Sequence, residues 1–190
     1  MADRIETLVT IEAAVVEELG AAVRHKGHPW RVGVLATTDG DIADARSVVL
    51  REWDEAQRAL LIYTDARSPK VEQFSAHPLG TLVLWSETLG WQLRLRVKLE
   101  LQTAGLTVSS RWARLKMTPA AHDYLSPLPP GAALGHDGPH ERHRQAPARE
   151  SRGHFAVVVA RVQSIDWLEL HADGHRRARF DSRGARWLAP

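Results

Sequence analysis

Two short stretches of the sequence carry the residue types that hold a phosphate group. Arg46 and Arg51 flank the apolar run 47–50, and Ser68 and Lys70 follow a second apolar run. A phosphate monoester carries nearly two negative charges, and proteins hold it with arginine forks, a lysine ammonium and free amides at a helix N-terminus. We therefore expect the two stretches to meet in one anion-binding corner. The alternative is that Ser68 only caps a helix and Lys70 is solvated.

The local patterns around these residues indicate how they are positioned. Arg46 and Arg51 are five residues apart, so strict alternation places them on opposite faces of a strand, and a bend or a strand end must bring both to one ligand. Ser68-Pro69 predicts a helix start, with the Ser68 hydroxyl accepting from first-turn amides and Pro69 at the first helical position. This helix should end before Pro78.

The remaining elements are mostly short strands. An apolar stripe at three- and four-residue steps predicts an N-terminal helix over 5–25. Helices are also expected at 109–117 and 118–125, and a mobile loop at 126–153, which is rich in Pro, Gly, His and Arg. Strands are predicted at 32–36, 47–50, 60–63, 80–85, 91–101, 155–162, 165–170, 177–180 and 186–188. Many short strands at close spacing, with few helices between them, favour one antiparallel barrel domain, mainly β with flanking helices, over a βαβ sheet.

The composition excludes several classes of protein. The formal net charge is +2, so nucleic acid is not an expected partner. Cysteine is absent, which removes disulfides, thiolate metal ligands and any flavin attached through sulfur. Acidic and basic residues interrupt the first twenty positions, so we predict neither a signal peptide nor a membrane span, and expect a cytoplasmic protein.

Four histidines in and beside the polar loop are candidate metal ligands: His136, His140, His143 and His154. Imidazoles three or four residues apart can share an ion when they lie on a helix. The surrounding Gly and Pro residues make a helix there improbable. We therefore predict a solvated loop and no metal site.

The chain resembles the pyridoxamine 5'-phosphate oxidase family of FMN-binding split barrels, and especially its uncharacterised bacterial FMN-binding branch. The resemblance covers about residues 31–101 and 155–190, and depends on the order and spacing of several pieces. These are 45–51 (ARSVVLR), 63–70 (YTDARSPK), His77-Pro78, 91–94 (WQLR), 177–180 (RARF) and 187–190 (WLAP).

This resemblance implies an antiparallel split barrel that binds FMN at the interface of a homodimer. It also implies a set of cofactor-binding residues: Arg46, Ser47, Val48, Val49, Arg51, Tyr63, Thr64, Ser68, Lys70, Gln92, Trp167 and Arg179. Arg46 and Arg51 would serve the phosphate and ribityl region, Gln92 would hydrogen-bond the flavin, and Trp167 or its neighbour Leu168 would lie beside the ring. His175 and Arg177 match positions that contact the substrate.

Two departures from the family pattern qualify the expected activity. Pro69 stands where family oxidases usually have a second arginine, so one phosphate donor is missing or is replaced, for example by Arg67. The stretch 109–131 lacks the Arg-Pro segment of the vitamin-phosphate pocket, which argues against pyridoxamine phosphate oxidation. We predict hydride transfer between FMN and an unknown small substrate. The alternatives are a non-catalytic flavin carrier or sensor, or a barrel that binds deazaflavin or haem.

Overall fold

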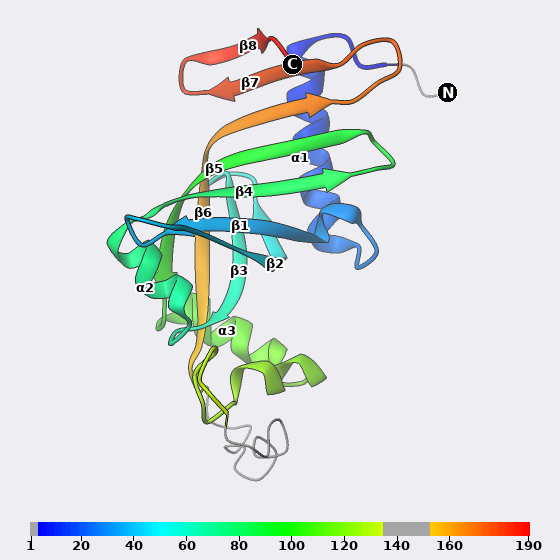
Figure 1. Cartoon of the computed structure of the whole chain (residues 1–190). Helices are drawn as coiled ribbons and strands as arrows, with labels where there is room; N and C mark the ends of the chain where they lie inside the picture. Colours follow the sequence, from blue (N-terminus) through cyan, green and yellow to red (C-terminus); the bar gives the residue numbers. More distant parts are fainter. Residues whose placement is uncertain (1–3, 135–152) are drawn as a thin grey trace.

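The computed structural model of the chain describes residues 4–134 and 153–190. In these residues eight strands form one antiparallel sheet in the order β3-β2-β1-β4-β5-β6-β7-β8, and a further pairing between β3 and β6 closes the first six strands into a barrel (Figure 1). The strands are β1 (Val32–Thr38), β2 (Ala43–Asp54), β3 (Ala59–Asp65), β4 (Leu79–Ser86), β5 (Trp91–Gln102), β6 (Phe155–Glu169), β7 (Arg176–Asp181) and β8 (Gly184–Leu188). The predicted antiparallel split barrel, mainly β with flanking helices, is confirmed.

Alternation along β5 shows how the sequence encodes the barrel wall. Leu93, Leu95, Val97 and Leu99 are buried in the barrel core, while the residues between them face outward. The first half of β6 differs, because every residue of 155–160 is buried. Its second face is covered by helices, which explains the continuous apolar run.

One strand prediction is wrong. The segments 155–162 and 165–170 were expected as two strands, but β6 runs through both as one continuous strand. Arg96 pairs with Ser164 and Val97 with Val162, so Gln163 is an extra residue in a β-bulge. The polar pair Gln163-Ser164 therefore marks an irregularity within a strand and not a turn.

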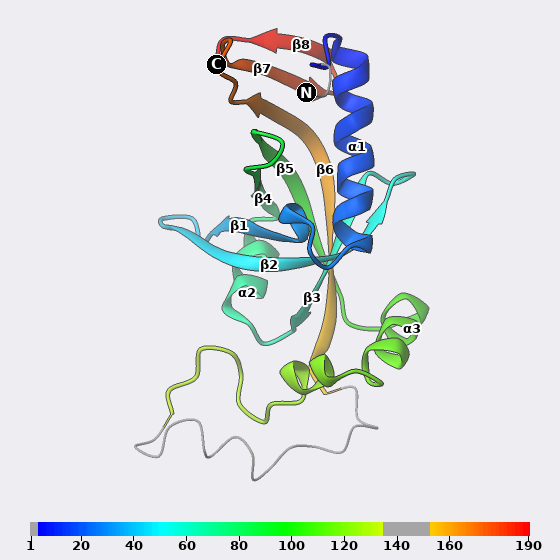
Figure 2. The same ribbon diagram turned by 90° about the vertical axis from the view of Figure 1, so that its right-hand side faces the viewer.

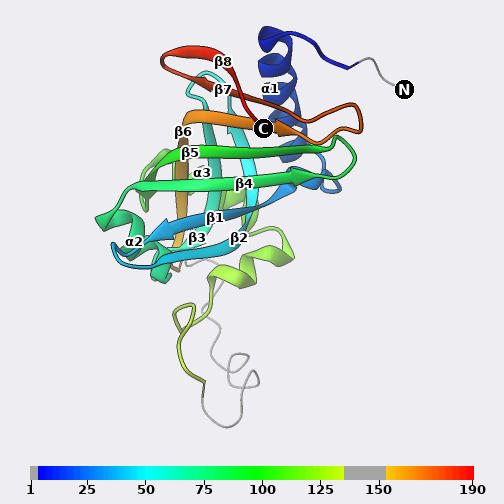
Figure 3. The same cartoon turned by 45° about the horizontal axis from the view of Figure 1, so that its top comes forward.

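The helices cover the two ends and one side of the barrel. α1 (Leu8–Arg24) begins with a capping box at Thr7, buries Ile11, Val15 and Leu19, and runs from the β7–β8 hairpin at its N-terminal end to β2 at the other (Figures 2 and 3). α2 (Pro69–Ala76) packs against β1 and β5 at another edge. α1 and α2 agree with the predicted helices to within a few residues.

A second apolar cluster lies outside the barrel wall. α3 (Leu106–Leu115) and the 3₁₀ helix η2 (Pro119–Tyr124) cover the outer face of β3 and the first half of β6. α3 begins three residues earlier than predicted, after Gly105, whose φ of 89° favours glycine. A further 3₁₀ turn, η1 (Pro29–Arg31), precedes β1. Of the predicted loop 126–153, residues 135–152 lie outside the described part of the chain, together with His136, His140 and His143.

Candidate functional site

The guanidinium of Arg46 lies where α2 packs against β1. Nη1 donates to the Thr37 hydroxyl at 2.6 Å and to the Leu35 carbonyl at 3.2 Å. Nη2 donates to Gln73 Oε1 at 2.8 Å and to Asp44 Oδ2 at 2.5 Å. Groups from two strands and one helix therefore fix the orientation of this cation.

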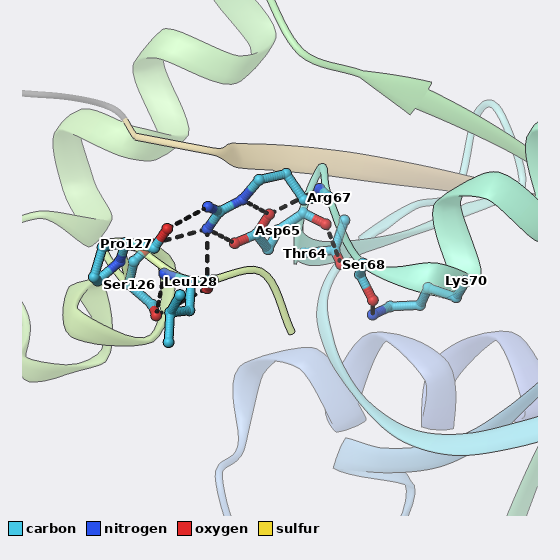
Figure 4. Close-up of polar contacts among 8 residues, drawn as sticks. All are labelled: Thr64, Asp65, Arg67, Ser68, Lys70, Ser126, Pro127 and Leu128. Carbon is cyan, nitrogen blue, oxygen red and sulfur yellow. Dashed lines mark hydrogen bonds and ion pairs between the residues drawn. The ribbon is translucent and has the colours of Figure 1, made fainter. Parts of the chain in front are cut away.

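Lys70 and Ser68 meet at the start of α2. The ammonium of Lys70 donates to Ser68 Oγ at 2.7 Å, and Ser68 is buried (Figure 4). Burial lowers the pKa of Lys70, and the nearby positive charge of Arg46 lowers it further. Two cations thus lie close together in a partly buried place, which is the electrostatic condition that an anionic ligand relieves.

The capping prediction for Ser68 is wrong, although Pro69 does occupy the first helical turn as expected. Within the described residues the Ser68 side chain makes no capping hydrogen bond to α2. Its hydroxyl oxygen accepts from Lys70 instead, because the lysine side chain folds back over the helix start. The first turn of α2 is therefore not closed by its own N-cap side chain.

We call Arg46, Ser68, Lys70 and Gln73 the cationic corner. It brings Arg46 close to the start of α2: Arg46 bonds to Gln73 of that helix, and its charge acts on Lys70 one turn earlier. The sequence analysis missed Gln73. Its position three residues after Lys70 on a helix, which places it on the same side, is the signal that could have found it.

Arg51 lies among other neighbours. A register shift between Leu50 and Glu52 forms the bend that the sequence argument required. The bend directs the Arg51 guanidinium over the ring of Tyr63, with Cζ 5.4 Å from its centroid. Burial raises the pKa of Tyr124, and the charge and hydrogen bond of Arg51 oppose that rise. The contacts of Arg51 and of Arg46 are thus different, and this arrangement does not bring both arginines to one point.

The buried Nε of Arg51 has no hydrogen-bond partner among the residues that the structure describes. Arg31 is close enough for the charge of Arg51 to lower its pKa, after the larger effect of burial. Arg51 is therefore a partly satisfied cation beside a second one.

Tyr63 faces the helical cluster outside the barrel. Its hydroxyl donates to Glu52 Oε1 at 2.9 Å, and Arg111 grips both oxygens of Glu52 at 2.8 and 2.6 Å. Burial, followed by the charge of Glu52, raises the pKa of Tyr63 to about 12. Thr64 is buried, and its hydroxyl donates to the Asp65 carbonyl at 3.3 Å. Both side chains already have partners within the chain.

Arg67 holds the segment after η2 against the β3–α2 connection (Figure 4). Its guanidinium grips both carboxylate oxygens of Asp65 at 3.1 and 2.7 Å, and donates to the carbonyls of Ser126, Pro127 and Leu128 at 2.8, 3.0 and 3.3 Å. A cavity of about 590 Å³ opens beside Asp65 under this segment. These contacts direct the Arg67 guanidinium toward Asp65 and residues 126–128 and away from Lys70 (Figure 4).

Gln92, Arg177 and Arg179 lie together on the outer face of β5, β6 and β7. Gln92 pairs with Leu168, and Leu168 pairs with Arg177. The buried Asp166 accepts hydrogen bonds from three arginines. Their distances are 2.9 Å for Arg94, 2.9 Å for each of two bonds from Arg177, and 3.1 Å for Arg179.

Hydrogen bonds to these arginines hold the pKa of the Asp166 carboxyl below its usual range, although burial acts in the opposite direction. One carboxylate thus aligns three cations on this face. His175 lies exposed in the turn before β7, where its Nδ1 accepts from the His171 amide at 3.2 Å.

Trp167 does not reach this outer face, which corrects its predicted place beside a flavin ring. It alternates with the outward positions 166 and 168, so its indole points into the core, is 0% exposed and packs edge-on against Trp91 with centroids 5.5 Å apart. Leu168 occupies the outward position beside Gln92 and Arg177.

The three residues after Arg46 are divided between the two faces of β2. Val48 is buried in the barrel core. Ser47 and Val49 alternate with it and face outward, opposite Val34 and Val32 of β1. The side chain of Val48 therefore contributes to the core, and only its backbone is available to a ligand on the outside.

Within the chain the cationic corner and the outer-face residues are separated. Thr81 pairs with Ala36, the neighbour of Thr37, whereas Trp85 pairs with Gln92. Four residues of β4 correspond to about 14 Å. Figures 1 and 2 show α2 and the β7–β8 hairpin at opposite ends of the barrel. Between them the outer face exposes Val32, Val34 and Trp85, at 50%, 43% and 45%.

Comparison with known proteins gives a family match over the first half of this structure. Residues 12–103 match the FMN-binding domain of pyridoxamine 5'-phosphate oxidase. A pyridoxine/pyridoxamine 5'-phosphate oxidase of Caulobacter vibrioides is 32% identical over 104 residues, 53% of this chain and 46% of that protein. The same enzyme of Azorhizobium caulinodans is 35% identical over 85 residues, 44% of this chain and 39% of that protein. The match therefore spans less than half the length of these relatives.

Solved structures agree in fold over nearly the whole chain. A pyridoxamine 5'-phosphate oxidase-related, FMN binding protein from Nostoc punctiforme has a TM-score of 0.74 and 19% identity, covering 97% of this chain and 100% of that one. PhzG from Burkholderia lata, solved with tetrahydrophenazine-1-carboxylic acid, has a TM-score of 0.70 and 15% identity, covering 100% and 95%. The barrel topology and these structures show that the chain has the fold of FMN-binding split barrels, and residues 12–103 match the FMN-binding domain of the pyridoxamine 5'-phosphate oxidase family.

Proposed function

We propose that the chain binds FMN with its phosphate in the cationic corner and works as an FMN-dependent oxidoreductase. The observation that carries the proposal is the pair of neighbouring cations, Arg46 and Lys70, beside an α2 start that Ser68 does not cap. A phosphate dianion there would offset the repulsion between the two cations and accept hydrogen bonds from both. The residue types in 46–51 and 63–70 predict a phosphate here, and the family resemblance predicts that this phosphate belongs to FMN.

The proposal includes a homodimer. The cationic corner lies about 14 Å along β4 from Gln92. A second copy that covers the exposed Val32, Val34 and Trp85 would bury an apolar surface and could bring its own outer-face residues to the corner of the first copy. Each flavin would then have its phosphate held by one protomer and its ring approached by Gln92 and Arg179 of the other.

A bound flavin would supply the hydride chemistry, and the residues of the chain would bind and orient. Gln92 can donate and accept hydrogen bonds at a polar ring edge. Arg177 and Arg179, aligned by Asp166, present positive charge on the same face. His175 and Arg177 would contact a small substrate. We do not propose pyridoxamine phosphate as that substrate, because 109–131 lacks the Arg-Pro segment and Arg111 is committed to Glu52.

The proposal places the protein in the cytoplasm. In the residues that the structure describes, no helix has the length and apolar character needed to span a membrane.

The visible absorption spectrum of the purified protein tests this proposal. We expect a flavin spectrum, its loss in the Arg46→Ala/Lys70→Ala double variant, and reduction by a nicotinamide donor followed by reoxidation in air. A double variant as yellow as the parent would contradict the assignment of the corner. A haem or deazaflavin spectrum would contradict the cofactor, and a bound flavin that no donor reduces would leave a carrier or sensor in place of an enzyme.

A further inference from the structure

Every terminal nitrogen of Arg46 is already engaged within the chain. The guanidinium has five N–H donors. Four of them serve Leu35, Thr37, Asp44 and Gln73. A phosphate that is gripped by the two terminal nitrogens must therefore take a donor away from one of these partners, since only the Nε–H is left over.

Asp44 differs from the other three partners because it carries a negative charge. Its Oδ2 lies 2.5 Å from Nη2 of Arg46 and also accepts from Gln73 Nε2 at 3.1 Å. The hydrogen bond from Gln73 and the charge of Arg46 hold the pKa of the Asp44 carboxyl below its usual range, so this group is ionised at neutral pH. A resident carboxylate thus occupies the fork that would grip a phosphate.

Exposure indicates that this contact can be displaced. The Asp44 side chain is 52% exposed, so its carboxylate would return to water when a ligand takes the fork. Thr37 and the Leu35 carbonyl are buried and would lose their partner without solvent to replace it. Among these three partners, Asp44 is the one whose release costs least.

We infer that Asp44 is an internal competitor for the phosphate site and sets its affinity. This inference rests on the proposed function, because it concerns the same corner. With Asp44 in place the corner offers two cations and one anion, and without it two cations alone. The phosphate of FMN and free phosphate share this chemistry, whereas riboflavin, which has the same ring and no phosphate, does not.

Affinities of the parent and two variants for FMN, riboflavin and inorganic phosphate test the inference. Flavin fluorescence quenching would give the affinities of FMN and riboflavin, and the thermal midpoint as a function of inorganic phosphate would report phosphate binding. Asp44→Asn should bind FMN about three- to fivefold more tightly than the parent, the range expected for one exposed ion pair. Riboflavin affinity should not change. Asp41→Asn is the matched control, since it removes the same charge three residues away on the same hairpin, and its effect should stay below about twofold.

The inference is overturned if Asp44→Asn binds FMN equally or more weakly, if riboflavin affinity changes as much, or if Asp41→Asn has the same effect. A weaker FMN complex would mean that Asp44 orients Arg46 for the ligand. Asp44→Ser provides a second neutral variant if the asparagine protein does not fold. If neither the parent nor any variant binds FMN, the proposed function fails, and the phosphate titration alone tests the role of Asp44. Stronger stabilisation by phosphate in Asp44→Asn than in the parent would then support competition by Asp44, and equal stabilisation would overturn it.

Discussion

Lys70→Gln should separate the stability of the flavin-free protein from its affinity for FMN. Glutamine removes the charge but keeps an N–H donor for Ser68 Oγ, which accepts from Lys70 at 2.7 Å. The flavin-free protein then loses a half-buried cation whose pKa is lowered by burial and by Arg46. Its stability should be unchanged or greater, while the phosphate loses one of its two cationic partners.

The size of both effects follows from the contacts. Removing one charge-assisted hydrogen bond to the phosphate costs about 1.5–3 kcal/mol, which weakens FMN binding by about 10- to 150-fold. Replacing a partly buried ion by a neutral group is neutral or stabilising, here by up to about 1 kcal/mol. For a chain of this length that corresponds to a rise of about 2–4 °C in the thermal midpoint.

Thermal unfolding of the flavin-free proteins and fluorescence titration with FMN measure the two effects separately. Lys26→Gln, which removes an exposed lysine beyond α1, is the control and should alter neither quantity. A Lys70→Gln protein that is destabilised by more than about 1 kcal/mol, or that binds FMN as tightly as the parent, would refute this reasoning.

Three further outcomes are expected. Phosphate binding needs the charged form of Lys70, which is present below its pKa. Because this pKa is lowered, FMN affinity should begin to fall at a lower pH, as the pH is raised, than it would for an ordinary lysine. Lys70→Arg should keep its affinity over the same range, and identical pH profiles for the two proteins would contradict the lowered pKa. Asp166→Asn should lower the free energy of unfolding by about 2–3 kcal/mol because three arginines lose a buried carboxylate, against less than about 0.5 kcal/mol for the exposed Asp173→Asn. Folding lowers the pKa of Asp166, so the stability that this carboxylate contributes is present above its ordinary pKa and is lost as the pH falls. The free energy of unfolding of Asp166→Asn should therefore decrease less than that of the parent when the pH is lowered. Gly80→Ala should cost about 1–3 kcal/mol in urea unfolding because its Cβ would lie 2.9 Å from the Ala36 carbonyl oxygen, whereas Gly27→Ala meets nothing within 4 Å and should be tolerated.

Local patterns in the sequence predicted most of the fold. Alternation along β5 and the helix-start signal Ser68-Pro69 depend on neighbours in the chain, and both elements form where expected. Two strands were predicted in place of β6, on either side of the polar pair Gln163-Ser164. Pairing with β5 on one side absorbs the extra residue as a bulge, which is a tertiary effect that the segment alone does not reveal.

The candidate site was predicted less completely, for two physical reasons. Gln73 lies in α2 and Asp44 lies in the same hairpin as Arg46, and both belong to the site because they contact Arg46. No spacing rule for phosphate binding predicts either residue. The directions of Arg51 and Trp167 depend on strand irregularities: a bulge turns Arg51 toward Tyr63, and the register of β6 turns Trp167 inward. Residue type is readable from sequence, whereas side-chain direction near a bulge is not.

A crystal structure of the protein with FMN is the most direct measurement of where the phosphate binds. We predict phosphate oxygens at about 2.7–2.9 Å from Lys70 Nζ and from the Arg46 guanidinium, with the Asp44 carboxylate moved away from that fork. A phosphate bound elsewhere, for example against Arg177 and Arg179, with the Arg46–Asp44 pair intact, would contradict the central claim.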